Sequence, residues 1–120
     1  MLKLSKIMLL CTFVSLCLAI VAVAQAIAKS FRTTDIVARM GGEEFCVLAV
    51  NNNAPVETMN RLRQFIEGLA IPLNEKESLH LTVSVGVTAT LCDTLDEMIN
   101  RADEALYKAK QGGRNLVITQ

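Results

Sequence analysis

The chain has 120 residues and carries 12 Lys and Arg against 12 Asp and Glu, so its formal net charge at pH 7 is zero. A chain of this length is sufficient for one domain with one modest hydrophobic core. Because a balanced charge gives no general attraction for phosphate backbones, we expect no nucleic-acid partner. The 4 cysteines include no CxxC pair and have no histidine at ligand spacing, which favours a reduced protein over a zinc site or a disulfide framework.

The N-terminal segment is strongly apolar. Residues 7–28 hold no charged side chain, and as a helix they would span ~33 Å, about the hydrocarbon thickness of a bilayer. Lys3 and Lys6 precede this run, and Ala22-Val23-Ala24 has the small-residue pattern of a signal-peptide cleavage site. Composition alone therefore predicts a membrane anchor or an export signal here.

A pair of glycines lies between two strand-like runs. Residues 35–38 and 45–50 are mostly apolar, and Gly41 and Gly42 separate them. A tight turn needs a positive φ, which glycine adopts without steric penalty, so this pattern predicts a β-hairpin. Two glycines also allow another molecule to approach the backbone closely.

Two carboxylates follow the glycines directly. The like charges of Glu43 and Glu44 would repel each other unless a positive charge lies between them, and a hard divalent cation is the usual solution. The alternative from these residues alone is an ordinary acidic turn on the surface.

The remainder of the chain predicts helices and strands in alternation. The expected elements are a helix from Pro55 to about Leu69, a strand over 79–87, a helix over 95–111 and a short strand over 115–118. Asn53 is the expected N-cap of the first helix, and Thr94 begins a capping box ahead of the second. Strict alternation of apolar and polar residues over 79–87 predicts a half-buried strand.

Several motifs, taken together and in order, resemble those of one family. They are Arg32-Thr33-Thr34-Asp35, Gly41-Gly42-Glu43-Glu44-Phe45, the strand Thr82 to Val87, the helix Ala102 to Lys110, and Gly113-Arg114-Asn115. This set resembles the GGDEF family of diguanylate cyclases, in the Gly-Gly-Glu-Glu-Phe form, from about residue 19 to residue 120. Family enzymes condense two GTP molecules into cyclic di-GMP across a homodimer, each domain holding one GTP and its divalent metal.

The resemblance implies a fold and a set of ligands. The expected fold is an α/β domain of the nucleotidyl cyclase palm-like type, with a mainly antiparallel sheet and flanking helices. The expected cofactor is Mg²⁺ or Mn²⁺, and the expected partners are GTP, cyclic di-GMP and a second copy of the domain.

The resemblance also assigns residues to the catalytic site. Glu43 matches the family's metal ligand, and Glu43 and Glu44 together match its catalytic signature. Gly41 and Gly42 would let the nucleotide lie against the turn. Two basic residues, Lys110 and Arg114, match the pair that binds the GTP phosphates, as a point charge and a fork of donors respectively. The alternative for this pair is a solvated helix end.

A second site follows from the Arg-x-x-Asp motif. Arg32 and Asp35 match the family's inhibitory product site, where arginine can bind and stack on guanine and the carboxylate can accept from guanine N–H groups. Arg63 is a further candidate for the same ligand. An ion pair on the surface is the alternative interpretation.

The N-terminal part departs from the family pattern. Residues 23–32 resemble the family helix that leads into Arg-x-x-Asp, with Val23, Ile27 and Phe31 facing the sheet. Residues 1–20, however, lack the opening strand with its Asp-x-Asp-x-Phe-Lys-like motif. We therefore expect an apolar leader over residues 1–18, with a membrane segment extending to about 28 as one alternative, and a partial GGDEF domain lacking its N-terminal third over residues 19–120.

These observations lead to one main functional expectation and one alternative. The main expectation is a diguanylate cyclase by family that is inactive alone, because the missing segment carries metal and guanine contacts. The alternative is a non-catalytic domain, either a cyclic di-GMP binder or a remnant. Since export would separate the domain from GTP, we expect a cytoplasmic domain, with membrane contact or an inner-membrane anchor through residues 7–28.

Overall fold

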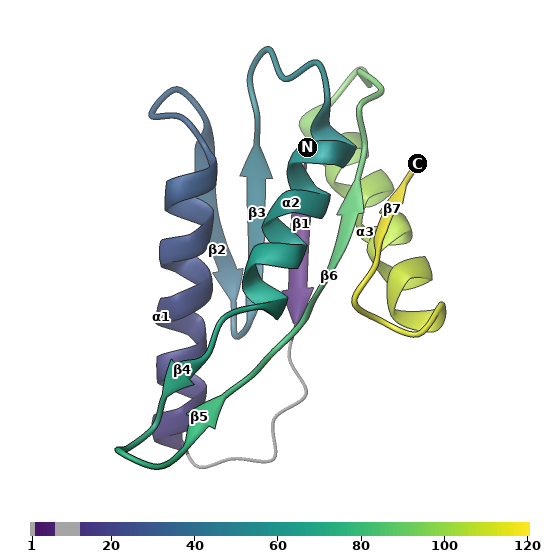
Figure 1. Ribbon diagram of the computed structural model, residues 1–120. Coiled ribbons are helices and arrows are strands. Elements are labelled where there is room, and N and C mark those ends of the chain that lie inside the picture. The colour runs from purple at the N-terminus through teal and green to yellow at the C-terminus, as the bar shows by residue number, and fades with distance from the viewer. Residues whose placement is uncertain (1, 7–12) are drawn as a thin grey trace.

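The computed structural model in Figure 1 describes residues 2–6 and 13–120. The elements in these ranges are β1 (Leu2–Lys6), α1 (Phe13–Ser30), β2 (Ile36–Gly41), β3 (Glu44–Leu48), α2 (Pro55–Glu67), β4 (Ile71–Pro72), β5 (Ser78–Leu79), β6 (Val83–Val87), α3 (Leu95–Gln111) and β7 (Val117–Thr119). One five-stranded sheet has the order β2-β3-β1-β6-β7, and β4 and β5 pair separately. Neighbours in the large sheet are antiparallel except β6 and β7. The expected α/β fold with a mainly antiparallel sheet is confirmed.

Helices cover both faces of the large sheet. α1 and α2 lie in front of it in Figure 1, and α3 lies behind it. β6 is therefore buried along its whole length, including Ser84. A Cβ added to Gly86 would lie 2.1 Å from the carbonyl oxygen of Ala102 and 2.3 Å from the backbone nitrogen of Leu106, so α3 packs directly on the strand. The predicted half-buried strand over 79–87 is thus a shorter strand buried on both faces, preceded by the separate strand β5.

The core lies between the sheet and the α1–α2 layer. Its fully buried members come from three parts of the chain: Ala19, Val23, Ala26 and Ile27; Met59, Leu62 and Ile66; and Val47, Val83, Val85 and Val87. Burial of an aliphatic side chain of this size stabilises the fold by roughly 1.5–3 kcal/mol. Val23 and Ile27 face the core as predicted, while Phe31 lies just beyond the helix and is half-buried.

Strand β1 differs from the leader expected over residues 1–18. β1 occupies the centre of the large sheet, where Leu4 lies opposite Phe45 of β3 and opposite Val85 of β6. α1 begins at Phe13, so residues 13–18 belong to a helix of the same domain. The strand has few residues, and both of its partners are distant in sequence, so no local pattern indicates it.

The structure describes residues 13–28 of the expected membrane segment. Within the described residues, no helix is both long and apolar enough to cross a membrane. Residues 13–28 instead form most of α1, which buries Ala19, Val23 and Ile27 in the core. Residues 7–12 lie outside the described ranges.

The predicted helix starts are close to the observed ones. Thr94 caps α3, because its Oγ1 accepts a 3.2 Å hydrogen bond from the backbone nitrogen of Glu97. The N-cap of α2 is Ala54 rather than Asn53. Asn52 stabilises this start instead, accepting at Oδ1 from the backbone nitrogen of Ala54 over 2.9 Å.

Candidate functional site

The glycine turn joins β2 and β3 as the sequence predicts. Gly41 has φ +139° and Gly42 has φ +51°, conformations that a residue with a side chain adopts only under strain. A Cβ built at either glycine would meet no atom within 4 Å, so the space in front of the turn is open. Arg39 fixes the turn, since its Nε and Nη2 donate to the carbonyl oxygen of Gly42 over 2.9 and 2.7 Å. Sequence reasoning did not identify Arg39.

The two predicted carboxylates lie next to strand β1. Glu43 is in the turn, Glu44 begins β3, and both are half-buried. The residue opposite Glu44 on β1 is Ser5. The sequence of β1 is Leu-Lys-Leu-Ser-Lys, so the central strand brings no carboxylate to this end of the sheet.

The predicted phosphate-binding pair lies at the end of α3. Lys110 is in the last turn of α3 and half-buried, whereas Arg114 follows the helix and is exposed. Gly113, Arg114 and Asn115 have φ values of +111°, +64° and +49°. In Figure 1, the α3–β7 connection and the β2–β3 turn lie at the same end of the sheet, the lower one in that view. The elements bearing Gly41, Gly42, Glu43, Glu44, Lys110 and Arg114 therefore lie at one end of the sheet, with β1 and β6 between them.

Arg32 and Asp35 lie at the opposite end of the sheet, in the α1–β2 connection (Figure 1). Asp35 accepts 2.9 Å hydrogen bonds from the backbone nitrogen of Val50 at Oδ1 and from that of Arg32 at Oδ2. The Val50 bond, then the Arg32 bond and the Arg32 charge, lower the pKa of Asp35. A cavity of about 120 Å³ is lined by both Arg32 and Asp35.

Among the described residues that line this cavity, Arg63 does not occur. Its Nη1 donates to Oε2 of Glu67 over 3.0 Å and to Oδ1 of Asn115 over 2.9 Å. Asn115 in turn donates from Nδ2 to Oε1 of Glu67 over 3.0 Å. Glu67 and Asn115 were not predicted as site residues, and their contacts join segments far apart in sequence. The sequence signals for Asn115 are its place in the Gly113-Arg114-Asn115 motif and the tolerance of asparagine for left-handed backbone.

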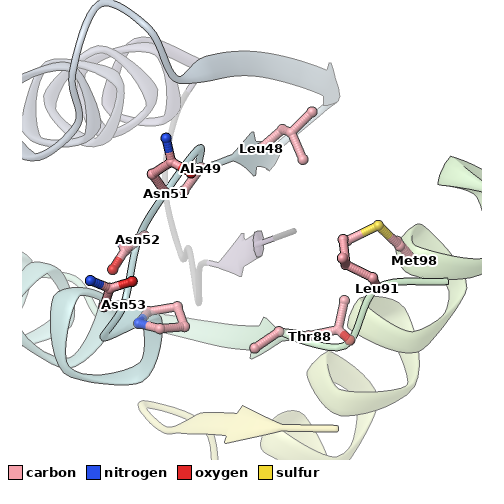
Figure 2. Close-up of a pocket in the computed structure, with 10 residues that line it drawn as sticks. Leu48, Ala49, Asn51, Asn52, Asn53, Thr88, Leu91 and Met98 are labelled. Atoms are coloured by element: carbon pink, nitrogen blue, oxygen red, sulfur yellow. The ribbon is translucent and has the colours of Figure 1, made fainter.

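A larger cavity has a volume of about 300 Å³ (Figure 2). It lies between the end of β3 and the segment after it, with Leu48 and Asn51, and the segment after β6, with Thr88 and Leu91. Met98 of α3 closes one side. Its lining includes none of the residues that the sequence assigned to a site.

Comparison with known proteins identifies the family. Residues 18–116 match the family model described as "Diguanylate cyclase, GGDEF domain". Diguanylate cyclase A of Treponema denticola is 37% identical over 99 residues, which cover 79% of this chain and 26% of that protein. Diguanylate cyclase DgcP of Pseudomonas aeruginosa is 41% identical over 97 residues, which cover 78% of this chain and 14% of that protein. The crystal structure of the GGDEF domain of DgcB from Caulobacter crescentus in complex with c-di-GMP is similar with a TM-score of 0.79 and 25% identity, over 98% of this chain and 75% of that one.

The chain belongs to the GGDEF family of diguanylate cyclase domains. It spans about a quarter of the length of Diguanylate cyclase A, and a smaller share of DgcP. Domains of this family bind GTP and cyclic di-GMP, and the cyclases generally depend on a metal ion.

Within the part of the chain that the structure describes, few carboxylates lie near the glycine turn. Glu43 and Glu44 are the carboxylates at the glycine turn, and the neighbouring strand β1 adds none. Over residues 2–6 and 13–120, no group of three or more His, Cys, Asp or Glu side chains could hold a metal ion. Mg²⁺ is commonly held by one or two carboxylates together with substrate phosphates and waters, so Glu43 and Glu44 are the candidate protein ligands at this turn.

Proposed function

We propose that this chain is a nucleotide-binding GGDEF domain that holds the phosphates of GTP at the edge bearing the glycine turn and the end of α3. The observation that carries the proposal is that these two elements lie at the same end of the sheet (Figure 1). The open space at Gly41 and Gly42 would let the nucleotide lie against the backbone. Lys110 and Arg114 would supply the positive charge.

The proposed chemistry follows from the residue types. A guanidinium offers paired N–H donors that match two phosphate oxygens, and an ammonium adds a mobile point charge. In the family reaction, the 3′-hydroxyl of one GTP loses its proton and attacks the α-phosphate of the other, and the bond from that phosphate to the β-phosphate breaks to release pyrophosphate. This arrangement requires two domains facing each other. Glu43 and Glu44 are the proposed catalytic carboxylates, and Glu43 is the proposed metal ligand.

We propose further that the chain does not carry out this reaction alone. Phosphoryl-type transfer depends almost entirely on positioning and on neutralising charge on the phosphates. β1 supplies no carboxylate, so in this proposal Glu43 and Glu44 would hold the metal without a ligand from the central strand, and its position would be less firmly fixed. We therefore expect the chain to bind GTP without converting it into cyclic di-GMP.

A second candidate function is binding of cyclic di-GMP through the Arg32 end of the domain. The guanidinium of Arg32 makes no hydrogen bond within the described residues and lines the 120 Å³ cavity, which leaves it available to a ligand. Asp35 is less suited to this role, because both of its carboxylate oxygens already accept from backbone N–H groups. In a titration with cyclic di-GMP, Arg32→Ala should weaken the affinity and Arg114→Ala should leave it unchanged.

Isothermal titration with GTP and Mg²⁺ tests the main proposal. We expect Arg114→Ala and Lys110→Ala to weaken binding by roughly 10-fold each, the effect of losing a charged hydrogen bond. Arg101→Ala is the matched control, since Arg101 is an exposed arginine of the same helix, and it should bind as the unaltered chain does. Absence of saturable binding, or equal weakening by Arg101→Ala, would contradict the proposal.

A further inference from the structure

The segment that carries Arg114 has an unfavourable backbone conformation. Arg114 and Asn115 both have positive φ, at +64° and +49°. For residues with a side chain this left-handed region is sparsely populated, although asparagine tolerates it better than arginine does. Two such residues in succession persist only where surrounding contacts hold them.

A closed ring of side chains supplies these contacts. Asn115 accepts from Nη1 of Arg63 over 2.9 Å and donates to Oε1 of Glu67 over 3.0 Å, while Arg63 and Glu67 form an ion pair of 3.0 Å. The Arg63 side chain is only 15% exposed, so the ring is partly shielded from water. The ring requires an asparagine, because one short side chain must accept from an arginine and donate to a glutamate at once.

The backbone of the same segment is also tied down. The nitrogen of Arg114 donates to the carbonyl oxygen of Ala109 over 3.0 Å, and the nitrogen of Asn115 donates to Oγ of the buried Ser84 over 3.2 Å. The Arg114 side chain, in contrast, is exposed and makes no hydrogen bond within the described residues. The backbone at Arg114 is therefore held in place, while its guanidinium is exposed and available to a ligand.

We propose that Arg63, Glu67 and Asn115 are positioning residues, which lock the α3–β7 connection to α2 so that Arg114 is aimed at the phosphate edge. This inference rests on the proposed function, in which Arg114 binds phosphate. It assigns Arg63 a different task from binding product together with Arg32. The ring acts only through Arg114, so its loss should reduce recognition of the outer phosphates and leave recognition of the nucleoside unchanged.

Two measurements test the ring separately from the proposed function. The first is amide hydrogen exchange at Arg114 and Asn115, which needs no ligand. The second is the ratio of affinities for GTP and GMP in the presence of Mg²⁺, which isolates contacts with the outer phosphates. The variants are Asn115→Gly, which keeps the left-handed backbone at no steric cost but removes the amide, and Glu67→Gln. Glu57→Gln, an exposed glutamate of the same helix, is the control.

We expect Asn115→Gly and Glu67→Gln to accelerate exchange at Arg114 and Asn115 by about 10-fold and to lower the GTP-to-GMP affinity ratio by a similar factor. Glu57→Gln should change neither quantity. Unchanged exchange in Asn115→Gly would overturn the inference, as would faster exchange with an unchanged affinity ratio. A chain that shows no preference for GTP, or an Arg114→Ala variant that keeps it, would instead refute the proposed function, and the exchange measurement would still decide whether the ring holds the segment.

Discussion

At the scale of single residues, Asp35 shows how one side chain can join two loops. Its carboxylate accepts from the backbone nitrogen of Arg32 in its own loop and from that of Val50 in the segment after β3, each over 2.9 Å. These bonds favour the charged form and lower the pKa of Asp35 in the folded chain. The resemblance assigned Asp35 to a ligand, and the structure adds a structural role for the same carboxylate.

A pH-dependent stability effect follows from the lowered pKa of Asp35. A carboxyl group with a depressed folded pKa contributes stability above its unfolded pKa, about 3.9, and this contribution disappears as the pH falls through the folded pKa. We predict that Asp35→Asn lowers the midpoint of thermal unfolding by a few degrees at pH 7 and that the difference narrows below about pH 4. Asp93→Asn, at an exposed aspartate, should show no such pattern. A deficit of equal size at pH 7 and pH 3 would contradict the explanation.

At the scale of elements, the packing of α3 on β6 determines how the end of α3 is placed relative to the sheet. Gly86 allows this approach, because any side chain there would overlap the backbone of Ala102 and Leu106. The sequence shows Gly86 only as one polar-side position of an alternating strand. Its role follows from the burial of both strand faces, which no single strand pattern can indicate.

We predict that Gly86→Ala destabilises the domain by about 1–3 kcal/mol or more, as expected for overpacking against backbone. Gly68→Ala is the matched control, since its nearest neighbouring atom would lie 3.5 Å away and its φ of −81° suits alanine. That variant should be neutral or slightly stabilising. Urea denaturation measures both, and a Gly86→Ala variant as stable as Gly68→Ala would show that α3 does not contact β6 in this way.

Much of the element structure could be predicted from the sequence, for local reasons. The hairpin follows from Gly41 and Gly42, and the start of α3 from the side-chain cap at Thr94. The contacts that hold the candidate site could not, because their partners are distant in the chain. Asn115 contacts residues that are 48 and 52 positions away in sequence, and no periodic pattern records such pairs.

At the scale of the whole molecule, β1 connects the two halves of the sheet. It pairs with β3 on one side and β6 on the other, so the hairpin half and the α3 half meet only through it in the large sheet. The two elements that form the candidate phosphate edge therefore depend on the N-terminal residues for their relative placement. The sequence did not indicate this dependence, because the apolar composition of residues 1–18 predicted a leader instead of a strand and a helix of the domain.

We predict that Leu4→Pro prevents cooperative folding, because proline removes a backbone N–H and is excluded from central strands. Leu4→Val keeps the amide and should fold. Circular dichroism and the width of the thermal transition distinguish the two outcomes. Native-like cooperativity in Leu4→Pro would show that residues 2–6 are not the central strand.

The central claim is that the domain holds GTP phosphates but lacks the donors to complete the reaction. Its most direct test is mass-spectrometric detection of cyclic di-GMP after incubation of the purified chain with GTP and Mg²⁺ or Mn²⁺, alongside Glu43→Ala and Arg114→Ala. We predict no product above the enzyme-free background in any sample, while titration detects GTP binding that Arg114→Ala weakens. Cyclic di-GMP formed by the unaltered chain and abolished by Glu43→Ala would contradict the claim, because it would mean that the metal site is complete without a carboxylate from β1.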